Sequence, residues 1–162
     1  MWSAAWPCCS RNGNDCRGTA AGIAVSAAGQ GLVHAPLITD EDVVRLRKLV
    51  RDEMVALKFS LIEQTKMVTA ASELARNTLR YGGGGRAELE LVERGGKRGV
   101  QVSFIDEGPG IADIDLALTD GYTSGGGMGL GLSGARRLAD DFILDSAPGK
   151  GTTVTIAKWK LF

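Results

Sequence analysis

Long apolar runs and an excess of charge of either sign are both missing from this sequence. No stretch approaches the ~20 apolar residues of a membrane span, and the first residues lack the basic start and apolar core of a secretory signal. Lysine and arginine together number 19, as do aspartate and glutamate, so no net field attracts the chain to nucleic acid or anionic lipid. Membrane insertion, secretion and nucleic-acid binding are therefore disfavoured.

Cysteine and histidine are also scarce. The three cysteines, Cys8, Cys9 and Cys16, crowd near the N-terminus without the repeated spacing of a zinc site or the even number of a disulfide framework. Because no cysteine follows Cys16, the folded part needs no disulfide, which favours a reducing compartment and hence the cytoplasm. The one histidine is His34, and a metal site that joins it to the cysteines is the alternative interpretation.

The organisation along the chain indicates one domain with an N-terminal extension. The chain has 162 residues, 44% of them hydrophobic and 23% charged, which is typical of an ordinary globular domain. Residues 1–31 show neither the helical nor the strand period, so we expect a disordered or non-native extension with no assigned function. Residues 32–162 then form the folded domain.

Two helices are predicted in the first half of the domain. Residues 32–38 can form an edge strand, after which Thr39 has the position of a helix N-cap. Apolar residues at steps of three and four continue this helix to about residue 58. Ser60 is the N-cap of a second helix, which runs to the glycines at residues 82–85, where it ends.

The second helix has two distinct faces. One is apolar and predicts burial, with Met67, Ala71, Leu74 and Thr78. The other repeats polar residues at the same steps: Lys66, Thr69, Glu73, Asn77 and Arg80. On an isolated helix such a polar face is ordinarily exposed to solvent, so its meaning depends on motifs elsewhere in the chain.

Alternating apolar and polar residues predict two antiparallel hairpins. The first pairs residues 87–91 with residues 100–104, and the last pairs residues 142–144 with residues 153–159. The order helix, helix, hairpin, loop, helix, hairpin predicts an α+β fold, with a mixed sheet and helices on one face.

Glycine is in excess, and its positions indicate a ligand. The 23 glycines are about twice the usual ~7% share, and they gather after residue 106, at residues 125–131 and at residues 149–151. Backbone amides in such loops approach phosphate closely, so a nucleotide is the natural candidate. The two common nucleotide motifs fail, because no strand precedes the second cluster and the third lacks the upstream glycine and Lys-Ser/Thr pair of a P-loop.

Four elements in a fixed order carry a more specific signal. Glu73 and Asn77 stand four apart on one helix face, and Asp106 opens an Asp-x-Gly-x-Gly-Ile turn. The glycine cluster and then a Gly-Thr-Thr at residues 151–153 follow. Together they resemble the ATP-binding boxes of the GHKL family, shared by gyrase, a heat-shock chaperone, histidine kinases and mismatch-repair ATPases. The resemblance implies a two-layer sandwich that binds ATP.

The resemblance also implies a role for each matching residue. Asn77 would ligate Mg²⁺, which prefers oxygen ligands, and Glu73 would be the general base. Asp106 would accept a hydrogen bond from the adenine amino group, supported by the hydroxyl of Thr152 or Thr153. The glycine-rich loops, the second as a hinged lid over the phosphates, would supply the remaining contacts: Gly108, Gly110, Gly125, Gly126, Gly127, Gly129, Leu130 and Gly131.

Within the GHKL family the chain resembles the RsbT-like switch kinases of stressosome complexes, stand-alone bacterial serine/threonine kinases that regulate sigma factors. Residues 72–77, 120–122 and 136–142 carry this resemblance, together with Lys158-Trp159. The length leaves no room for the additional domains of gyrases and chaperones. A histidine kinase needs a phosphoacceptor histidine on an upstream helix, whereas His34 lies in a segment without helical period.

The RsbT-like resemblance implies phosphorylation of a serine or threonine on a STAS-domain protein, and then activation of a PP2C-type phosphatase as a partner switch. An anti-sigma factor kinase of the RsbW or sporulation type, which binds a sigma factor directly, shares the ATP site and stays open as the alternative. A third interpretation is a nucleotide-binding adaptor without catalysis. Glu73 argues against an adaptor, because a purely structural site has no use for a base.

Overall fold

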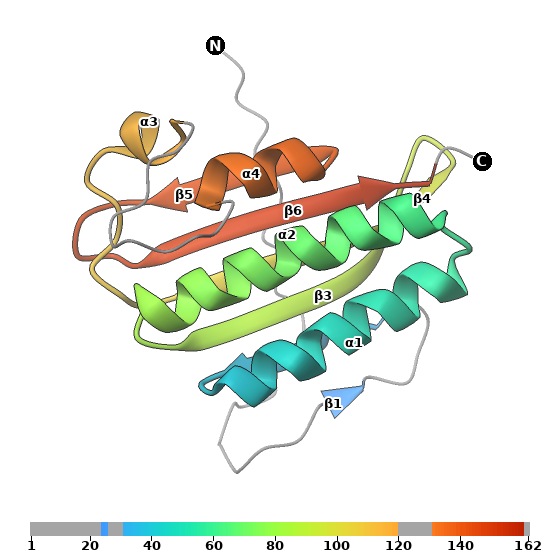
Figure 1. Ribbon diagram of the computed structural model, residues 1–162, viewed down its shortest axis with the longest axis horizontal. Coiled ribbons are helices and arrows are strands. Elements are labelled where there is room, and N and C mark those ends of the chain that lie inside the picture. Colours follow the sequence, from blue (N-terminus) through green and yellow to red (C-terminus); the bar gives the residue numbers. More distant parts are fainter. Residues whose placement is uncertain (1–23, 26–30, 120–130, 161–162) are drawn as a thin grey trace, which may run out of the picture.

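The molecule consists of a β-sheet with helices packed against one of its faces (Figure 1). The computed structural model describes residues 24–25, 31–119 and 131–160. The elements in chain order are β1 (Ala24–Val25), β2 (Val33–Leu37), α1 (Asp40–Ala56), α2 (Leu61–Arg80), β3 (Gly85–Arg94), β4 (Lys97–Asp106), α3 (Ile114–Ala117), α4 (Gly131–Leu138), β5 (Asp141–Ser146) and β6 (Thr152–Trp159). None of the described helices is long and apolar enough to cross a membrane.

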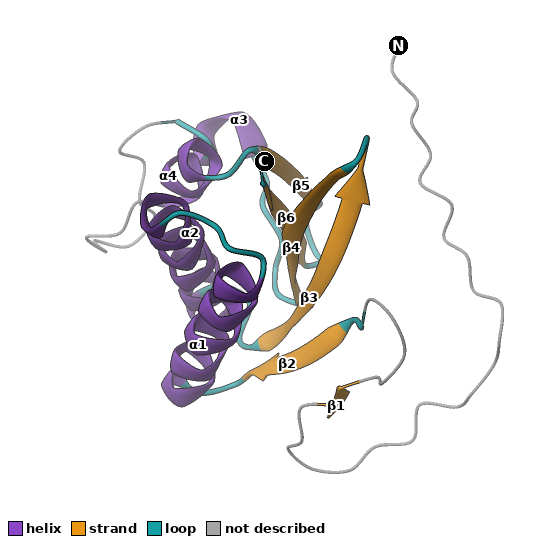
Figure 2. Cartoon of the chain, turned by 90° about the vertical axis from the view of Figure 1, so that its right-hand side faces the viewer, coloured by secondary structure: helices purple, strands orange, loops and turns teal. Residues whose placement is uncertain are grey.

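The helices and the sheet form two layers, which Figure 2 shows edge-on. The strands are hydrogen-bonded in the order β1-β2-β3-β4-β6-β5, and α1, α2 and α4 lie together on one side of them. This arrangement confirms the α+β two-layer sandwich with helices on one face. Both hairpins lie where the alternation of apolar and polar residues predicts them.

The sheet differs from the prediction in one respect, because every strand pair among the described residues is antiparallel rather than mixed. Strands β4 and β5 do run in the same direction, since each is antiparallel to β6. They would form a parallel pair if they were neighbours. The final hairpin instead inserts β6 between them, so their backbones are not bonded to each other.

The two long helices begin at the predicted caps. Thr39 and Ser60 each accept a hydrogen bond from the third residue of their helix, and the side chain of that residue bonds back to the cap. At the first cap, Asp42 is buried and accepts hydrogen bonds from the Ile38 and Thr39 amides and from Arg45. Burial alone raises the pKa of Asp42, but these hydrogen bonds and the guanidinium outweigh it and hold the pKa below its usual value.

The core lies between α2 and the central strands. The predicted apolar face of α2 is buried throughout, including the Thr78 side chain. It packs with residues of β3, β4 and β6, among them Leu89, Phe104 and Ile156, each at most 1% exposed. Burial on this side fixes the rotation of α2 about its axis, so the polar face that carries Glu73 and Asn77 turns toward the end of the sheet where β4 finishes and β6 begins.

One short strand falls within the predicted N-terminal extension. Residues 24–25 form β1, which pairs Ala24 with His34 and Val25 with Val33. The predicted strand at residues 32–38 is thus β2, with β1 on its outer side. The proposed domain boundary at residue 32 stays a prediction.

Candidate functional site

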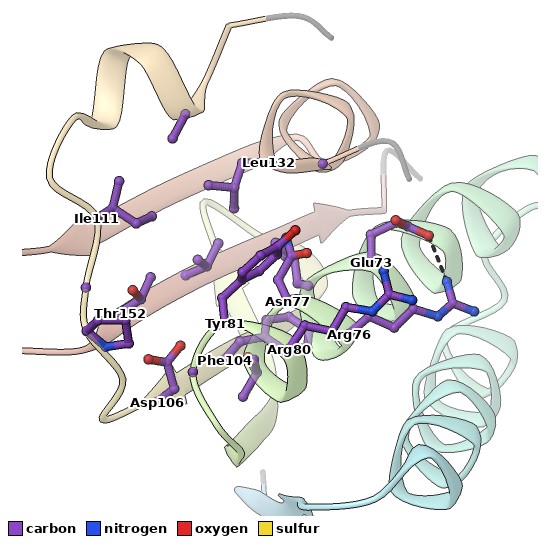
Figure 3. A pocket seen from close by; sticks show the side chains of 18 of the residues that line it. Glu73, Arg76, Asn77, Arg80, Tyr81, Phe104, Asp106, Ile111, Leu132 and Thr152 are labelled. Carbon is purple, nitrogen blue, oxygen red and sulfur yellow. Dashed lines mark hydrogen bonds and ion pairs between the residues drawn. The ribbon is translucent and has the colours of Figure 1, made fainter. Parts of the chain in front are cut away.

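A cavity of about 450 Å³ lies between the C-terminal half of α2, the loop after β4, the start of α4 and the start of β6. Four segments that are far apart in sequence therefore meet at one place. Of the residues predicted for the site, six line this cavity: Glu73, Asn77, Asp106, Gly110, Gly131 and Thr152. Figure 3 shows the Asp106–Thr152 end and the Glu73 end of the cavity on opposite sides of Asn77 and Tyr81.

The α2 side of the cavity carries polar and charged side chains. Glu73 and Asn77 are one helical turn apart and both face the cavity. The Nη1 atom of Arg76 lies 2.8 Å from Oε1 of Glu73, and the side chains of Glu73 and Arg76 are 17% and 43% exposed. The carboxylate is thus mostly enclosed and is held by a cation from its own helix. We call Glu73, Arg76 and Asn77 the α2 wall.

The opposite end of the cavity is built from two neighbouring strands. Asp106 at the end of β4 lies directly opposite Thr152 at the start of β6, so both side chains stand on the same face of the sheet. The Gly108 amide donates a 2.9 Å hydrogen bond to Oδ1 of Asp106, which fixes the carboxylate. The Asp106 side chain lines the cavity (Figure 3), and a carboxylate can accept more than one hydrogen bond. We call Asp106 and Thr152 the base end.

Two glycines hold the loops of the base end against each other. Gly110 and Gly151 have φ angles of +73° and +75°, which side chains other than glycine rarely adopt. A Cβ at Gly110 would also collide with the carbonyl of Ala147, and one at Gly151 with the carbonyl of Asp106. The positive φ and the close backbone approach are each enough to favour glycine at these two positions, and the proposed contact of Gly110 with a base stays a prediction.

Two residues predicted for the site do not line the cavity. Gly108 packs its Cα side against Gly82 at the end of α2, where a Cβ would collide, and its amide serves Asp106. Thr153 follows Thr152 on a strand, so its side chain points to the other face of the sheet. The lid glycines and Leu130, residues 125–130, lie outside the described residues.

Several cavity residues were not predicted from the sequence. The walls between the two ends are apolar, and Tyr81 reaches in beside Asn77 (Figure 3). Arg80, which also lines the cavity, was assigned only to the polar face of the helix. Apolar residues give no signal by which a cavity wall differs from core before the fold is known: Leu74, Phe104, Pro109, Ile111, Leu116, Leu132 and Val154.

The chemistry of the cavity fits a nucleotide with a divalent cation. An apolar middle suits a planar base, the Asp106 carboxylate accepts hydrogen bonds at one end, and Arg76 and Arg80 supply positive charge near the other. The amide oxygen of Asn77 is a ligand that Mg²⁺ accepts. Within the described residues there is no group of three or more His, Cys, Asp and Glu that could hold a metal ion.

Known proteins resemble this chain in sequence. Residues 62–161 match the family described as histidine kinase-, DNA gyrase B- and HSP90-like ATPase. The chain is 42% identical over 123 residues to serine/threonine-protein kinase RsbT of Bacillus subtilis, which covers 76% of this chain and 92% of that protein.

Two further similarities concern parts of longer proteins. The virulence sensor protein BvgS of Bordetella bronchiseptica is 31% identical over 124 residues, or 67% of this chain but 10% of BvgS. The crystal structure of the RsbU and RsbW domains of Rv1364c from Mycobacterium tuberculosis superposes with a TM-score of 0.55 and 18% identity, over 80% of this chain and 33% of that one. The structural match supports the fold alone.

Proposed function

We propose that this chain, which belongs to the family of histidine kinase-, DNA gyrase B- and HSP90-like ATPases, transfers the γ-phosphate of ATP to a hydroxyl of a STAS-domain partner. Within the family it is an RsbT-like serine/threonine-protein kinase. The observation that carries this proposal is the cavity in which a carboxylate, a carboxamide and a fixed hydrogen-bond acceptor meet. Glu73, Asn77 and Asp106 come from two elements and face one space.

Each end of the cavity has its own part in the proposed reaction. Asp106 and Thr152 hold the base of the nucleotide, and the amide oxygen of Asn77 ligates Mg²⁺. When bound, Mg²⁺ neutralises part of the phosphate charge that the protein alone leaves uncompensated. Glu73 orients the attacking serine or threonine hydroxyl and takes up its proton. Arg76 holds the Glu73 carboxylate from the side, at 2.8 Å.

The proposal includes a cytoplasmic location, where ATP and Mg²⁺ are available, and a PP2C-type phosphatase as second partner. Its support is the 42% identity to an RsbT kinase over nearly the whole length of that protein. The anti-sigma alternative uses the same ATP site, so the cavity does not separate the two. The two alternatives differ in the second partner, which is a phosphatase for the switch kinase and a sigma factor for the anti-sigma kinase.

One experiment tests the reaction and another tests the partners. Incubation of the protein with Mg²⁺, ATP and each STAS-domain protein of the same organism should yield a phosphoserine or phosphothreonine, detected by mass spectrometry, and Asn77→Ala should abolish it. If ATP binds but no hydroxyl is phosphorylated, the adaptor interpretation replaces the kinase.

Capture of partners from the same organism then distinguishes the two kinase types. Retention of a STAS-domain protein and a PP2C-type phosphatase supports the switch kinase. Tight binding of a sigma factor without phosphatase binding would favour the anti-sigma alternative.

A further inference from the structure

Ser146, the last residue of β5, joins three segments that surround the base end. Its Oγ accepts a hydrogen bond from the amide of Ile111 at 2.9 Å and donates one to the carbonyl of Gly151 at 2.8 Å. A third contact, at 3.0 Å, joins Ser146 Oγ to Oγ1 of Thr152. Ser146 itself does not line the cavity, whereas Thr152 does.

The hydrogen-bonding capacity of a hydroxyl decides the direction of the third contact. A serine hydroxyl has one hydrogen and two lone pairs. The hydrogen of Ser146 is used on Gly151 and one lone pair on Ile111. Thr152 must therefore donate its own hydrogen to Ser146, and Oγ1 of Thr152 is left with lone pairs alone.

The polarity of the base end follows from this assignment. An ionised carboxylate such as Asp106 offers only lone pairs, and Thr152 stands directly opposite Asp106 on the neighbouring strand. Two adjacent acceptors favour a ligand group that carries hydrogens. An amino group carries them, whereas a carbonyl oxygen meets lone pairs on both sides.

We propose that Ser146 is a specificity-determining residue that acts through Thr152. Because Ser146 accepts the hydroxyl hydrogen of Thr152, the base end selects a base whose amino group faces Asp106 and Thr152 over a base that has a carbonyl there. This inference rests on the proposed function, since it concerns the nucleotide that the cavity binds. It adds a residue outside the cavity to the groups that choose the nucleotide.

ATP and GTP are suitable probes, because guanine has a carbonyl where adenine has its amino group. Titration calorimetry on the full chain gives both affinities and their ratio. Ser146→Ala releases the Thr152 hydrogen, so we expect the preference for ATP over GTP to narrow about tenfold, the size of one hydrogen bond. Thr152→Val removes the lone pairs and should narrow the preference by roughly threefold.

The same chain offers a matched control. Ser103 on β4 and Thr155 on β6 also form a hydroxyl pair, at 2.9 Å, but neither lines the cavity. Ser103→Ala should leave the preference unchanged. In a Thr152→Val background, Ser146→Ala should change the ratio no further, because its effect on selection passes through the Thr152 hydroxyl.

The outcomes separate selection from simple support of the loops. If Ser146→Ala weakens ATP and GTP binding by the same factor, Ser146 only braces the loops and the inference is wrong. Should Ser146→Ala not fold, Thr152→Val decides, and an unchanged ratio there overturns the inference. If the wild-type protein binds neither nucleotide, the proposed function itself is wrong. If the wild type prefers ATP and Ser146→Ala has the same ratio of ATP to GTP affinity, only the inference is wrong.

Discussion

The two ends of the cavity are built in different ways. At the base end the backbone sets the geometry: Asp106 and Thr152 are paired strand residues, and Gly110 and Gly151 bring the flanking loops into backbone contact. At the α2 wall the geometry depends on side chains of a single helix, and one ion pair holds Glu73. The difference suggests that the base end supplies ligand affinity and the α2 wall supplies chemistry, so mutations at the two ends should have separable effects.

The largest effect is expected at the α2 wall, on turnover. Glu73→Gln keeps the shape of the side chain but removes the carboxylate that accepts the proton, a role typically worth ~10²- to 10⁴-fold in rate. Phosphorylation of the STAS-domain substrate should fall by that factor while ATP affinity changes little. Quantitative phosphopeptide analysis and calorimetry measure the two quantities, and full activity of Glu73→Gln would show that Glu73 is not the base.

At the base end the largest effect should be on affinity. Asp106→Asn places an amide donor where the adenine amino group needs an acceptor, which leaves polar groups unpaired at a cost of about 1–3 kcal/mol each. We expect ATP binding by calorimetry to weaken by about 10- to 100-fold. Equal ATP affinity in the wild type and in Asp106→Asn would show that the adenine base does not bind at this end of the cavity.

A smaller effect is expected when the ion pair of the α2 wall is removed. The Arg76 side chain is 43% exposed, and exposed ion pairs contribute about 0.2–1 kcal/mol, so Arg76→Ala should slow phosphorylation by at most about fivefold. Arg86→Ala is the matched control. The Nε atom of Arg86 lies 2.9 Å from Oε1 of Glu88, and neither residue lines the cavity. A loss of ATP affinity that exceeds the loss of rate would mean that Arg76 serves binding rather than Glu73.

The smallest effect on either end should come from Asp42, which completes the capping box at the start of α1. Because the pKa of Asp42 is lowered in the folded state, its stabilisation is complete above the usual carboxyl value of 3.8 and is lost as the pH falls below it. Asp42→Asn should cost about 1–2 kcal/mol of stability at pH 7 and less at pH 3. Thermal unfolding of both proteins at the two pH values tests this. A stability difference between the wild type and Asp42→Asn that is the same at both pH values would contradict it, and the ATP affinity at pH 7 should be unchanged.

The parts of the site that the sequence could predict are those set by local spacing. Glu73 and Asn77 are four residues apart on a helix that begins with a capping box, so their common face follows from the helical period alone. The sequence also predicts the turn after Asp106, because glycine and proline end the strand there. Neither prediction needed knowledge of which strands pair.

What could not be predicted depends on strand pairing across long separations. The pairing of β4 with β6 brings Thr152 opposite Asp106 and turns Thr153 away, and it is also why the sheet is antiparallel rather than mixed. Ser146 gave no signal, because a serine at a strand end is ordinary until β5 pairs with β6 and the loop at Ile111 closes over it. The packing of Gly108 against Gly82 is likewise a contact that only the fold reveals.

The most direct test of the division between the two ends is a crystal structure of the protein with Mg²⁺ and a non-hydrolysable ATP analogue. We expect the adenine against Asp106 and Thr152, and the metal and phosphates beside Asn77 with Glu73 free to receive a hydroxyl. A base bound at the α2 wall, or a nucleotide bound outside the cavity, would contradict the assignment of affinity to one end and chemistry to the other.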